Sequence, residues 1–369
     1  MIRLSKSIVG EKEANAVKNV IENVGYLGMG YEVQMFENEL EDYIGNSKYK
    51  CACVNTGTSA LHLAIEAIAS PGDEVLVPSF TYVATFQAIT AAGCVPIACD
   101  VRKDDLLLDI IDAEKRITSK TKIIMNVLYA SNTNNIDDVY LLAKKYNLRV
   151  IEDAAHAFGC THNGIKIGGK GDIICFSFDG IKNITSGEGG AIFSSDENVI
   201  NRVKDTRLLG VIKDSDNRFK GKRSWDFDVI NQGHRFHMSN IFAAIGRVQL
   251  KRFESEFSPI RKLIARKYIE LLSENKDVRF LKINYEFIVP HIFPILINKN
   301  KRNVLITSLK DNNIQFGMHY KPNHLLKRFR INYSLKICES SYNEIITLPI
   351  HPEISNFDIE KICKIINNI

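Results

Sequence analysis

The stretch IICFSFDGIKNITSGEGG, residues 173–190, combines a strand signal with a chemical one. Its first six residues are apolar except for one serine, which is typical of a strand buried on both faces of a parallel sheet. The run then enters a loop rich in glycine and hydroxyl residues that carries Lys182. Ligands of open α/β sheets bind at the carboxyl ends of strands, so this loop can hold Lys182 facing a ligand. A single loop lysine is more often a solvated charge, and the neighbouring motifs decide its interpretation.

Short apolar runs alternate with helical patterns from about residue 58 to residue 193. The strands predicted on this basis are Glu74–Val77, Lys122–Leu128, Arg149–Asp153 and Ile173–Phe178. The segment Asp137–Asn147 has apolar residues at three- and four-residue steps, which predicts a helix with Asp137 as its cap. Strands that alternate with helices predict an α/β fold with a mostly parallel sheet covered on both faces.

A polar, basic stretch from Arg207 to Asp228 interrupts the hydrophobic periodicity, and a helical pattern resumes over Ser239–Phe253. A chain of 369 residues is long enough for two domains. We therefore expect a large domain over residues 1–240, which includes an N-terminal helical segment, and a smaller C-terminal α/β domain over residues 241–369.

The composition excludes several classes of protein. Hydrophobic residues make up 45% and charged residues 25%, which is ordinary for a globular protein and unlike a disordered one. The net charge of +5 is spread among acidic residues, so we expect no nucleic-acid partner. The first residues contain no secretory signal and no apolar run approaches the roughly 18 residues of a membrane span, which favours a cytoplasmic protein without a membrane partner. The eight cysteines show no C-x-x-C spacing, and we expect buried thiols and no metal site.

Three features ask for the same ligand. Gly57-Thr58-Ser59 closes a strand and opens a helix, so that free N–H groups form an anion cradle. Asp153 ends a strand and is followed by small residues that admit something flat. Each feature alone has a plainer interpretation as a helix cap. Together with Lys182 they suit a phosphate, a protonated ring nitrogen and an aldehyde, which pyridoxal phosphate combines in one molecule.

Six motifs in this order resemble the DegT/DnrJ/EryC1/StrS family of sugar aminotransferases. They are GTSAL (57–61), PSFTYVAT (78–85), EDAAH (152–156), GD (171–172), SF with KN (177–178 and 182–183) and GEGG (187–190). The resemblance continues more thinly through HYKP (319–322) and LPIHP (348–352).

The resemblance implies a fold-type-I enzyme dependent on pyridoxal 5'-phosphate, with a seven-stranded sheet, that works as a homodimer with active sites shared between subunits. Lys182 would bind the cofactor aldehyde and then move protons, and Asp153 would pair with the ring nitrogen. Tyr82 would stack on the ring, although it could also be a core aromatic. The further cofactor residues that the resemblance implies are Gly57, Thr58, Ser59 and Ser177 at the phosphate and His156 near the ring hydroxyl.

The sequence departs from the family pattern at two places. Arg235 stands where the family often has an asparagine that reaches the partner subunit's cofactor phosphate, and we expect Arg235 to do so. Residues 126–130, NVLYA, lack a histidine and a glycine that are more usual there. The resemblance places the substrate near His319, Tyr320, Lys321 and His324, of which Lys321 and His324 could equally be surface groups.

The predicted reaction transfers the amino group of L-glutamate to a nucleotide-linked 4-keto-6-deoxyhexose. The N-terminal segments 2–7 and 25–30 resemble enzymes that act at C4, which favours dTDP-4-keto-6-deoxy-D-glucose, with dTDP-4-amino-4,6-dideoxy-D-glucose as product, for the O-antigen of lipopolysaccharide. A C3 substrate and UDP- or GDP-linked sugars remain open. Two rival interpretations are a non-catalytic protein that binds pyridoxal phosphate and a nucleotide-dependent oxidoreductase. The glycines at 25, 28 and 30 that suggest the oxidoreductase lack the strand and helix it requires.

Overall fold

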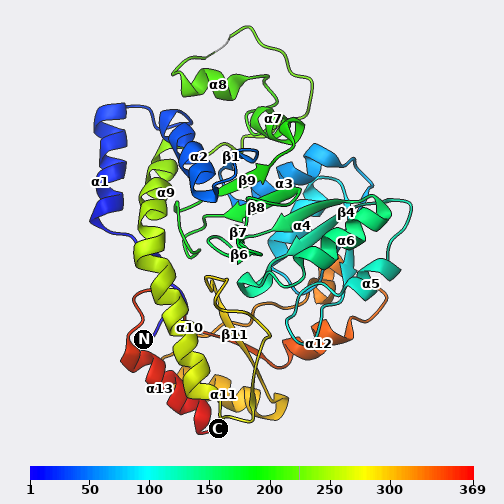
Figure 1. Cartoon of the computed structure of the whole chain (residues 1–369), viewed down its shortest axis with the longest axis vertical. Coiled ribbons are helices and arrows are strands. Elements are labelled where there is room, and N and C mark those ends of the chain that lie inside the picture. The colour runs from blue at the N-terminus through cyan, green and yellow to red at the C-terminus, as the bar shows by residue number, and fades with distance from the viewer. Residues whose placement is uncertain (224) are drawn as a thin grey trace.

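The computed structural model describes residues 1–223 and 225–369, which form one larger sheet, one smaller sheet and a two-stranded hairpin (Figure 1). The larger sheet has seven strands in the order β1-β9-β8-β5-β4-β2-β3. Its strands are β1 (Lys50–Val54), β2 (Glu74–Pro78), β3 (Val95–Cys99), β4 (Thr121–Val127), β5 (Arg149–Asp153), β8 (Ile173–Ser177) and β9 (Gly190–Ser194). Within this sheet β9 is antiparallel to both its neighbours, and the other pairs are parallel. The mostly parallel seven-stranded sheet and the four strands predicted from the sequence are confirmed.

Helices cover both faces of this sheet, which explains why its strands are almost uninterruptedly apolar. Along β8, Ile173 and Cys175 pack into the core on one face, while Ile174 and Phe176 pack into the core on the other. The first face lies under α3 (Gly57–Ile68), α4 (Val83–Ala91) and α7 (Glu197–Thr206). The second lies under α2 (Tyr31–Ile44), α5 (Ile110–Lys115), α6 (Ile136–Tyr146) and α9 (Asn240–Arg252). A short hairpin of β6 (Thr161–His162) and β7 (Ile165–Lys166) follows β5.

The smaller sheet is antiparallel, in the order β10-β11-β12, and forms its own core with three helices. Its elements are β10 (Val278–Phe280), β11 (Phe293–Ile297), β12 (Ile345–Leu348), α10 (Ser258–Leu272), α11 (Lys299–Asp311) and α13 (Asn356–Asn367). In Figure 1, α9 and α10 run end to end through the π-helical segment Phe253–Phe257 and connect the two parts. Residue 240, the predicted boundary, begins α9, whose Ala243 and Leu250 belong to the core of the larger sheet. The division at residue 240 stays a prediction.

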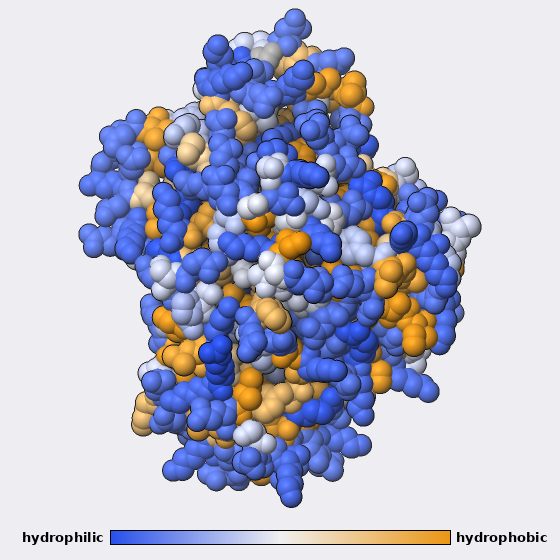
Figure 2. Space-filling view, viewed as in Figure 1, coloured by the Kyte–Doolittle hydropathy of each residue, from blue (hydrophilic) through white to orange (hydrophobic). Residues whose placement is uncertain are grey.

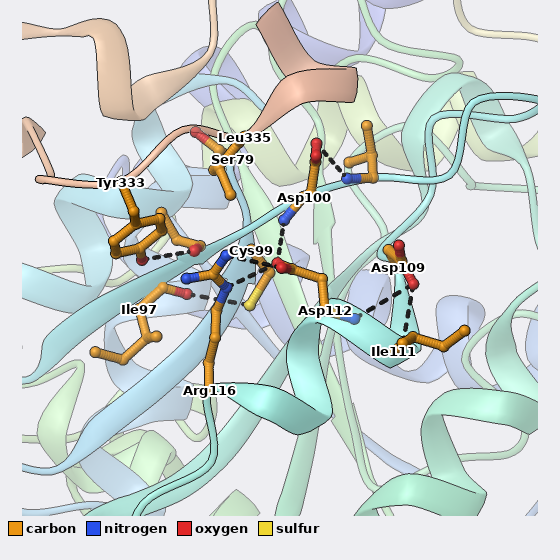
Figure 3. Close-up of polar contacts among 12 residues, drawn as sticks. Ser79, Ile97, Cys99, Asp100, Asp109, Ile111, Asp112, Arg116, Tyr333 and Leu335 are labelled. Atoms are coloured by element: carbon orange, nitrogen blue, oxygen red, sulfur yellow. Dashed lines mark hydrogen bonds and ion pairs between the residues drawn. The ribbon is translucent and has the colours of Figure 1, made fainter.

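The chain segment between β11 and β12 returns to the edge of the larger sheet (Figure 3). Tyr333 donates a hydrogen bond to the carbonyl oxygen of Ala98, at 2.8 Å, and the guanidinium of Arg116 lies 4.0 Å from the centre of the Tyr333 ring. The carboxylate of Asp100 accepts hydrogen bonds from the backbone N–H groups of Ile337 and Cys338 at the start of α12 (Lys336–Tyr342). These contacts fix residues 319–335 beside the carboxyl ends of the parallel strands. Residues 319–335 include two 3₁₀ turns, Asn323–Leu325 and Lys327–Phe329.

The N-terminal residues link the smaller sheet to the loop after β8. Ile2 forms a parallel bridge with Ile314, and the carbonyl oxygen of Leu4 accepts a hydrogen bond from the N–H of Ile350. The hydroxyl of Ser7 then donates to the carbonyl oxygen of Gly180. From there the chain enters α1 (Glu11–Asn19), which lies beside α9 (Figure 1) and ends in the π-helical turn Val20–Val24.

Two local predictions were wrong. The segment 207–228, predicted as a loop, contains the short helix α8 (Asp214–Phe219), where Arg218 and Asp214 pair at 2.6 Å one turn apart. Asp137 does not cap α6, because the helix begins at Ile136 and the Asp137 carboxylate pairs with His162 at 3.0 Å. The eight cysteines are buried free thiols, as expected. Within the described residues, no helix combines the length and the hydrophobicity that crossing a bilayer requires.

Candidate active site

A cavity of about 640 Å³ lies where the carboxyl ends of β4, β5 and β8 face the smaller sheet. Val127, Asp153 and Ser177, the last residues of these strands, line one side, and Thr347 and Leu348 of β12 line the other. The sequence-predicted residues that line it are Gly57, Thr58, Tyr82, Asp153, His156, Ser177, Lys182, His319 and Tyr320. This position is the one expected for a ligand of an open α/β sheet.

The first turn of α3 provides a site for an anion. Thr56 caps the helix by accepting a hydrogen bond from the N–H of Ser59 at 3.0 Å. The first N–H groups of a helix have no partner within it and favour negative charge. A Cβ atom at Gly57 would lie 2.7 Å from the Cβ of Ser177, so only glycine lets the hydroxyl of Ser177 lie beside this turn. Ser59 itself bonds Thr56 through both its N–H and its hydroxyl, and therefore shapes the turn without lining the cavity.

Asp153 presents a buried carboxylate to the cavity. Its Oδ2 accepts a hydrogen bond from Thr85 Oγ1 at 2.8 Å, and its Oδ1 accepts one from the N–H of Ala155 at 3.2 Å. Burial raises the pKa of Asp153, while these hydrogen bonds and the charge of Lys182 lower it. A positively charged group in the cavity would therefore be held strongly by Asp153 and would keep it ionised.

Lys182 extends from the loop after β8, where its own N–H bonds the carbonyl oxygen of Asp179 at 3.0 Å. Its Nζ lies 3.5 Å from Nε2 of His291. Burial lowers the pKa of Lys182, and the negative charges of Asp153 and Asp179 oppose that shift. A lysine with a depressed pKa supplies the neutral amine that attack on an aldehyde requires.

Three histidines surround Lys182, namely His156, His291 and His319. Burial lowers the pKa of each of them, and that of His319 falls to about 4. They are therefore neutral near pH 7 and add no positive charge beside the amine. His156 Nε2 lies 3.1 Å from the hydroxyl of Tyr320, and its ring centre is 4.6 Å from that of His291. In the described part of the chain, Nδ1 of His156 and Nδ1 of His291 are buried without a hydrogen-bond partner.

Tyr82 lies at the mouth of the cavity. Its side chain is 58% exposed, and its ring centre is 5.6 Å from that of Tyr320. The alternative that Tyr82 is a core aromatic is therefore wrong. Its exposure leaves the ring free to cover a bound molecule.

Besides Ser59, three predicted residues lie outside this cavity. His324 is buried, with Nδ1 2.7 Å from Ser79 Oγ and Nε2 3.3 Å from Glu339 Oε1, so it fixes the returning chain segment. Lys321 is an exposed surface group. Arg235 is also exposed, on the segment before α9, and does not line this cavity.

The stretch that departs from the family pattern keeps the backbone a glycine would favour. Ala130 has φ 51° and ψ 32°, in the left-handed region that glycine adopts most easily. The preceding Tyr129 donates its hydroxyl hydrogen to the carbonyl oxygen of His319. Val127 lines the cavity with an apolar side chain.

Two residues of the site escaped the sequence prediction. Thr85 belongs to the quoted motif 78–85, and the hydroxyl three residues after Tyr82 was the available signal. His291 lies just before β11, more than 100 positions from Lys182, and no local pattern marks it.

The residues present fit pyridoxal phosphate. The turn at Gly57 and Thr58 with Ser177 would hold the phosphate, Asp153 the ring nitrogen and Lys182 the aldehyde carbon. The buried carboxylate of Asp153, the amine of Lys182 and the close approach that Gly57 allows to Ser177 give the cavity the polar groups that such a ligand requires. This fold and this site define the class of pyridoxal-phosphate-dependent enzymes.

Comparison with known proteins agrees with this class. The chain matches the model of the DegT/DnrJ/EryC1/StrS aminotransferase family over residues 7–367. It is 31% identical to the UDP-4-amino-4-deoxy-L-arabinose–oxoglutarate aminotransferase of Shewanella sediminis, over 99% of this chain and 97% of that one.

Solved structures give the same result. The aminotransferase TlmJ of Streptoalloteichus hindustanus superposes with a TM-score of 0.91 and 26% identity, over 100% of this chain and 98% of that one. PseC of Helicobacter pylori, an aminotransferase involved in the biosynthesis of pseudoaminic acid, gives a TM-score of 0.89 and 26% identity, over 99% of this chain and 98% of that one. The chain belongs to the DegT/DnrJ/EryC1/StrS aminotransferase family. It is an enzyme, an aminotransferase, and it depends on pyridoxal phosphate, as members of the family do.

Proposed function

We propose that this enzyme transfers the amino group of L-glutamate to a nucleotide-linked keto sugar. The observation that carries the proposal is the convergence of Lys182, Asp153 and the turn at Gly57 on one cavity. His319 and Tyr320 also line this cavity. The Shewanella sediminis relative, whose name pairs a UDP-linked amino sugar with oxoglutarate, supports both the sugar nucleotide and the donor.

Pyridoxal phosphate, when bound, supplies an electron sink that stabilises negative charge on the carbon next to the reacting nitrogen. Lys182 would remove a proton from that carbon of the amino-acid donor, and later return one to the sugar carbon that receives the amine. Asp153 would keep the ring nitrogen protonated. The neutral histidines 156, 291 and 319 add no positive charge beside Lys182 and so leave its amine able to accept a proton.

The exact sugar is the finer part of the proposal. We favour dTDP-4-keto-6-deoxy-D-glucose and its O-antigen pathway on the N-terminal resemblance described above. The UDP-linked relative favours UDP as the alternative nucleotide. The eight buried free thiols support the cytoplasmic location we propose, since thiols persist there.

We also propose a homodimer with shared sites. Hydrophilic residues predominate on the face of the molecule shown in Figure 2, yet apolar side chains gather over the segment that carries α8. The exposed apolar residues of this segment are Leu209, Ile212, Trp225, Phe227, Val229 and Ile230. Exposed apolar groups of this density mark contact surfaces. Arg235 follows this segment in the chain, is exposed and does not line its own chain's cavity.

The test of the proposal is the half-reaction with L-glutamate. Wild-type enzyme loaded with pyridoxal phosphate should release 2-oxoglutarate, and Lys182→Ala should lose this activity together with the visible absorbance of the lysine-bound cofactor. Lys170→Ala, which removes an exposed lysine, is the matched control and should behave as wild type. Cofactor binding without 2-oxoglutarate from wild type would favour the non-catalytic alternative. Screening dTDP-, UDP- and GDP-linked 3-keto and 4-keto sugars then identifies the acceptor.

A further inference from the structure

A second cluster of polar side chains lies on α3 away from the cavity. His62 and Glu66 are one helical turn apart, and His234 reaches them from the segment before α9. Nε2 of His62 lies 3.1 Å from Glu66 Oε1, and Nε2 of His234 lies 3.0 Å from Glu66 Oε2. Two imidazole nitrogens and a carboxylate thus meet at one point.

We propose that His62, Glu66 and His234 bind a divalent transition-metal ion of the zinc type. Two nitrogen ligands and one oxygen ligand suit Zn²⁺ and leave a fourth position for water. One ligand atom from each residue lies within 4.8 Å of the others. Bonds of about 2.0–2.2 Å in a tetrahedral site separate the ligands by about 3.4 Å. The two nitrogen-to-oxygen distances, 3.1 and 3.0 Å, already have nearly this length.

The surroundings hold the ligands in place and leave access for an ion. The ring of His234 stacks on Phe236, with centres 4.7 Å apart and an angle of 9°, and the ring of His62 is 5.6 Å from Phe236. The side chains of Glu66 and His234 are each 21% exposed, so water can reach the cluster. An ordered but accessible set of ligands is what a metal site with a bound water requires.

The plainer account of this cluster is a hydrogen-bonded one, in which both imidazoles donate an N–H to Glu66. A metal ion would bind the same two Nε2 atoms, and each imidazole would then carry its proton on Nδ1. The ion would also tie residues 233–236 to α3, the helix whose first turn forms the anion site. That segment is also hydrogen-bonded to the residue after β1, where the N–H of Asn55 bonds the carbonyl oxygen of Phe236 at 2.7 Å, and to the end of α7, where the N–H of His234 bonds the carbonyl oxygen of Thr206 at 2.6 Å.

Zinc binding to the cofactor-loaded enzyme tests the proposal. Enzyme stripped with a chelator and titrated with Zn²⁺ should take up one tight equivalent per chain, measured by calorimetry and by metal analysis after dialysis. His234→Asn and Glu66→Gln should each lose that equivalent. His162→Asn is the matched control, because His162 pairs with a single carboxylate, that of Asp137, and should retain the binding.

Wild type that binds no Zn²⁺, or variants that keep the full equivalent, would overturn the proposal. If a variant fails to fold, a second measurement that uses only the wild type still tests the proposal. Crystals soaked in Zn²⁺ should give an anomalous peak between His62, Glu66 and His234, and peaks only elsewhere would contradict the site. Neither result depends on the sugar that the enzyme uses.

Discussion

Thr85 controls the charge of Asp153 through one hydrogen bond of 2.8 Å to its Oδ2. Replacing Thr85 by valine keeps the side-chain shape and removes this donor. A hydrogen bond to a charged group is worth about 1.5–3 kcal/mol, so we expect kcat to fall by about tenfold or more. The measurement is 2-oxoglutarate formation at saturating cofactor.

Thr90→Val is the control for this change, because Thr90 lies on the same helix and its hydroxyl bonds only backbone carbonyl oxygens. It should leave the rate unaltered. Equal loss in both variants would mean that the helix and not the carboxylate was disturbed.

Glu152, the neighbour of Asp153, makes stability depend on pH. Its side chain is 1% exposed and bonds the hydroxyl of Tyr140 at 2.8 Å, and burial raises its pKa from 4.5 to about 7. Between these values the unfolded chain loses a proton that the folded chain keeps, so the free energy of unfolding falls as pH rises and levels off above about 7. Glu152→Gln keeps the hydrogen bond and should remove up to about 3 kcal/mol of this decline.

Urea unfolding of the cofactor-free protein at pH 4.5 and pH 8 measures the effect. The free energy of unfolding of the variant, relative to that of wild type, should be higher at pH 8 than at pH 4.5. Glu360→Gln, at an exposed glutamate, is the control and should run parallel to wild type. A pH-independent difference for Glu152→Gln would show that Glu152 ionises normally in the folded state.

At the scale of elements, Arg207 joins four of them. It is fully buried at the end of α7, and its guanidinium donates to Glu37 of α2, at 2.5 Å, and to the carbonyl oxygen of Cys53 of β1, at 2.6 Å. A third hydrogen bond, of 3.1 Å, reaches Ser215 of α8. Arg207→Met leaves the Glu37 charge buried and unpaired, so we expect a loss of about 3–5 kcal/mol in unfolding free energy.

Denaturant unfolding checks this value. The control is Lys267→Met, which breaks the more exposed pair with Glu360 and should cost less than about 1 kcal/mol. Similar losses in the two variants would contradict the role assigned to the buried pair.

The same elements show what sequence could and could not predict. The strands were predictable because a parallel sheet covered on both faces leaves continuous apolar runs, as in Ile173–Ser177. Asp153 and Lys182 were predicted as site residues because Asp153 ends such a strand and Lys182 lies in the loop that follows one. Helix α8 was missed because its six residues are mostly polar and depend on tertiary contacts. His291 comes to Lys182 only when the smaller sheet packs on the larger one, and sequence spacing does not encode that packing.

At the scale of the whole molecule, the cavity is completed by segments from both sheets and from the N-terminus. Leu4 and Ser5 line it, and the same segment hydrogen-bonds the smaller sheet's last loop and the loop that carries Lys182. A movement of the smaller sheet would therefore shift the loop that carries Lys182. The exposed apolar segment before Arg235 lies at the other end of the molecule, which leaves it free to meet a second chain (Figures 1 and 2).

A mixing experiment tests whether Arg235 serves the partner's site. Lys182→Ala and Arg235→Ala chains are each expected to be nearly inactive as homodimers. If Arg235 acts across the interface, every mixed dimer has one site with an intact Lys182 and an intact Arg235, so an equal mixture should recover about a quarter of wild-type activity. Mixing Lys182→Ala with Asp153→Ala is the control and should recover nothing, because both residues line the same chain's cavity. No recovery in the first mixture would mean that Arg235 acts within its own chain or not at all.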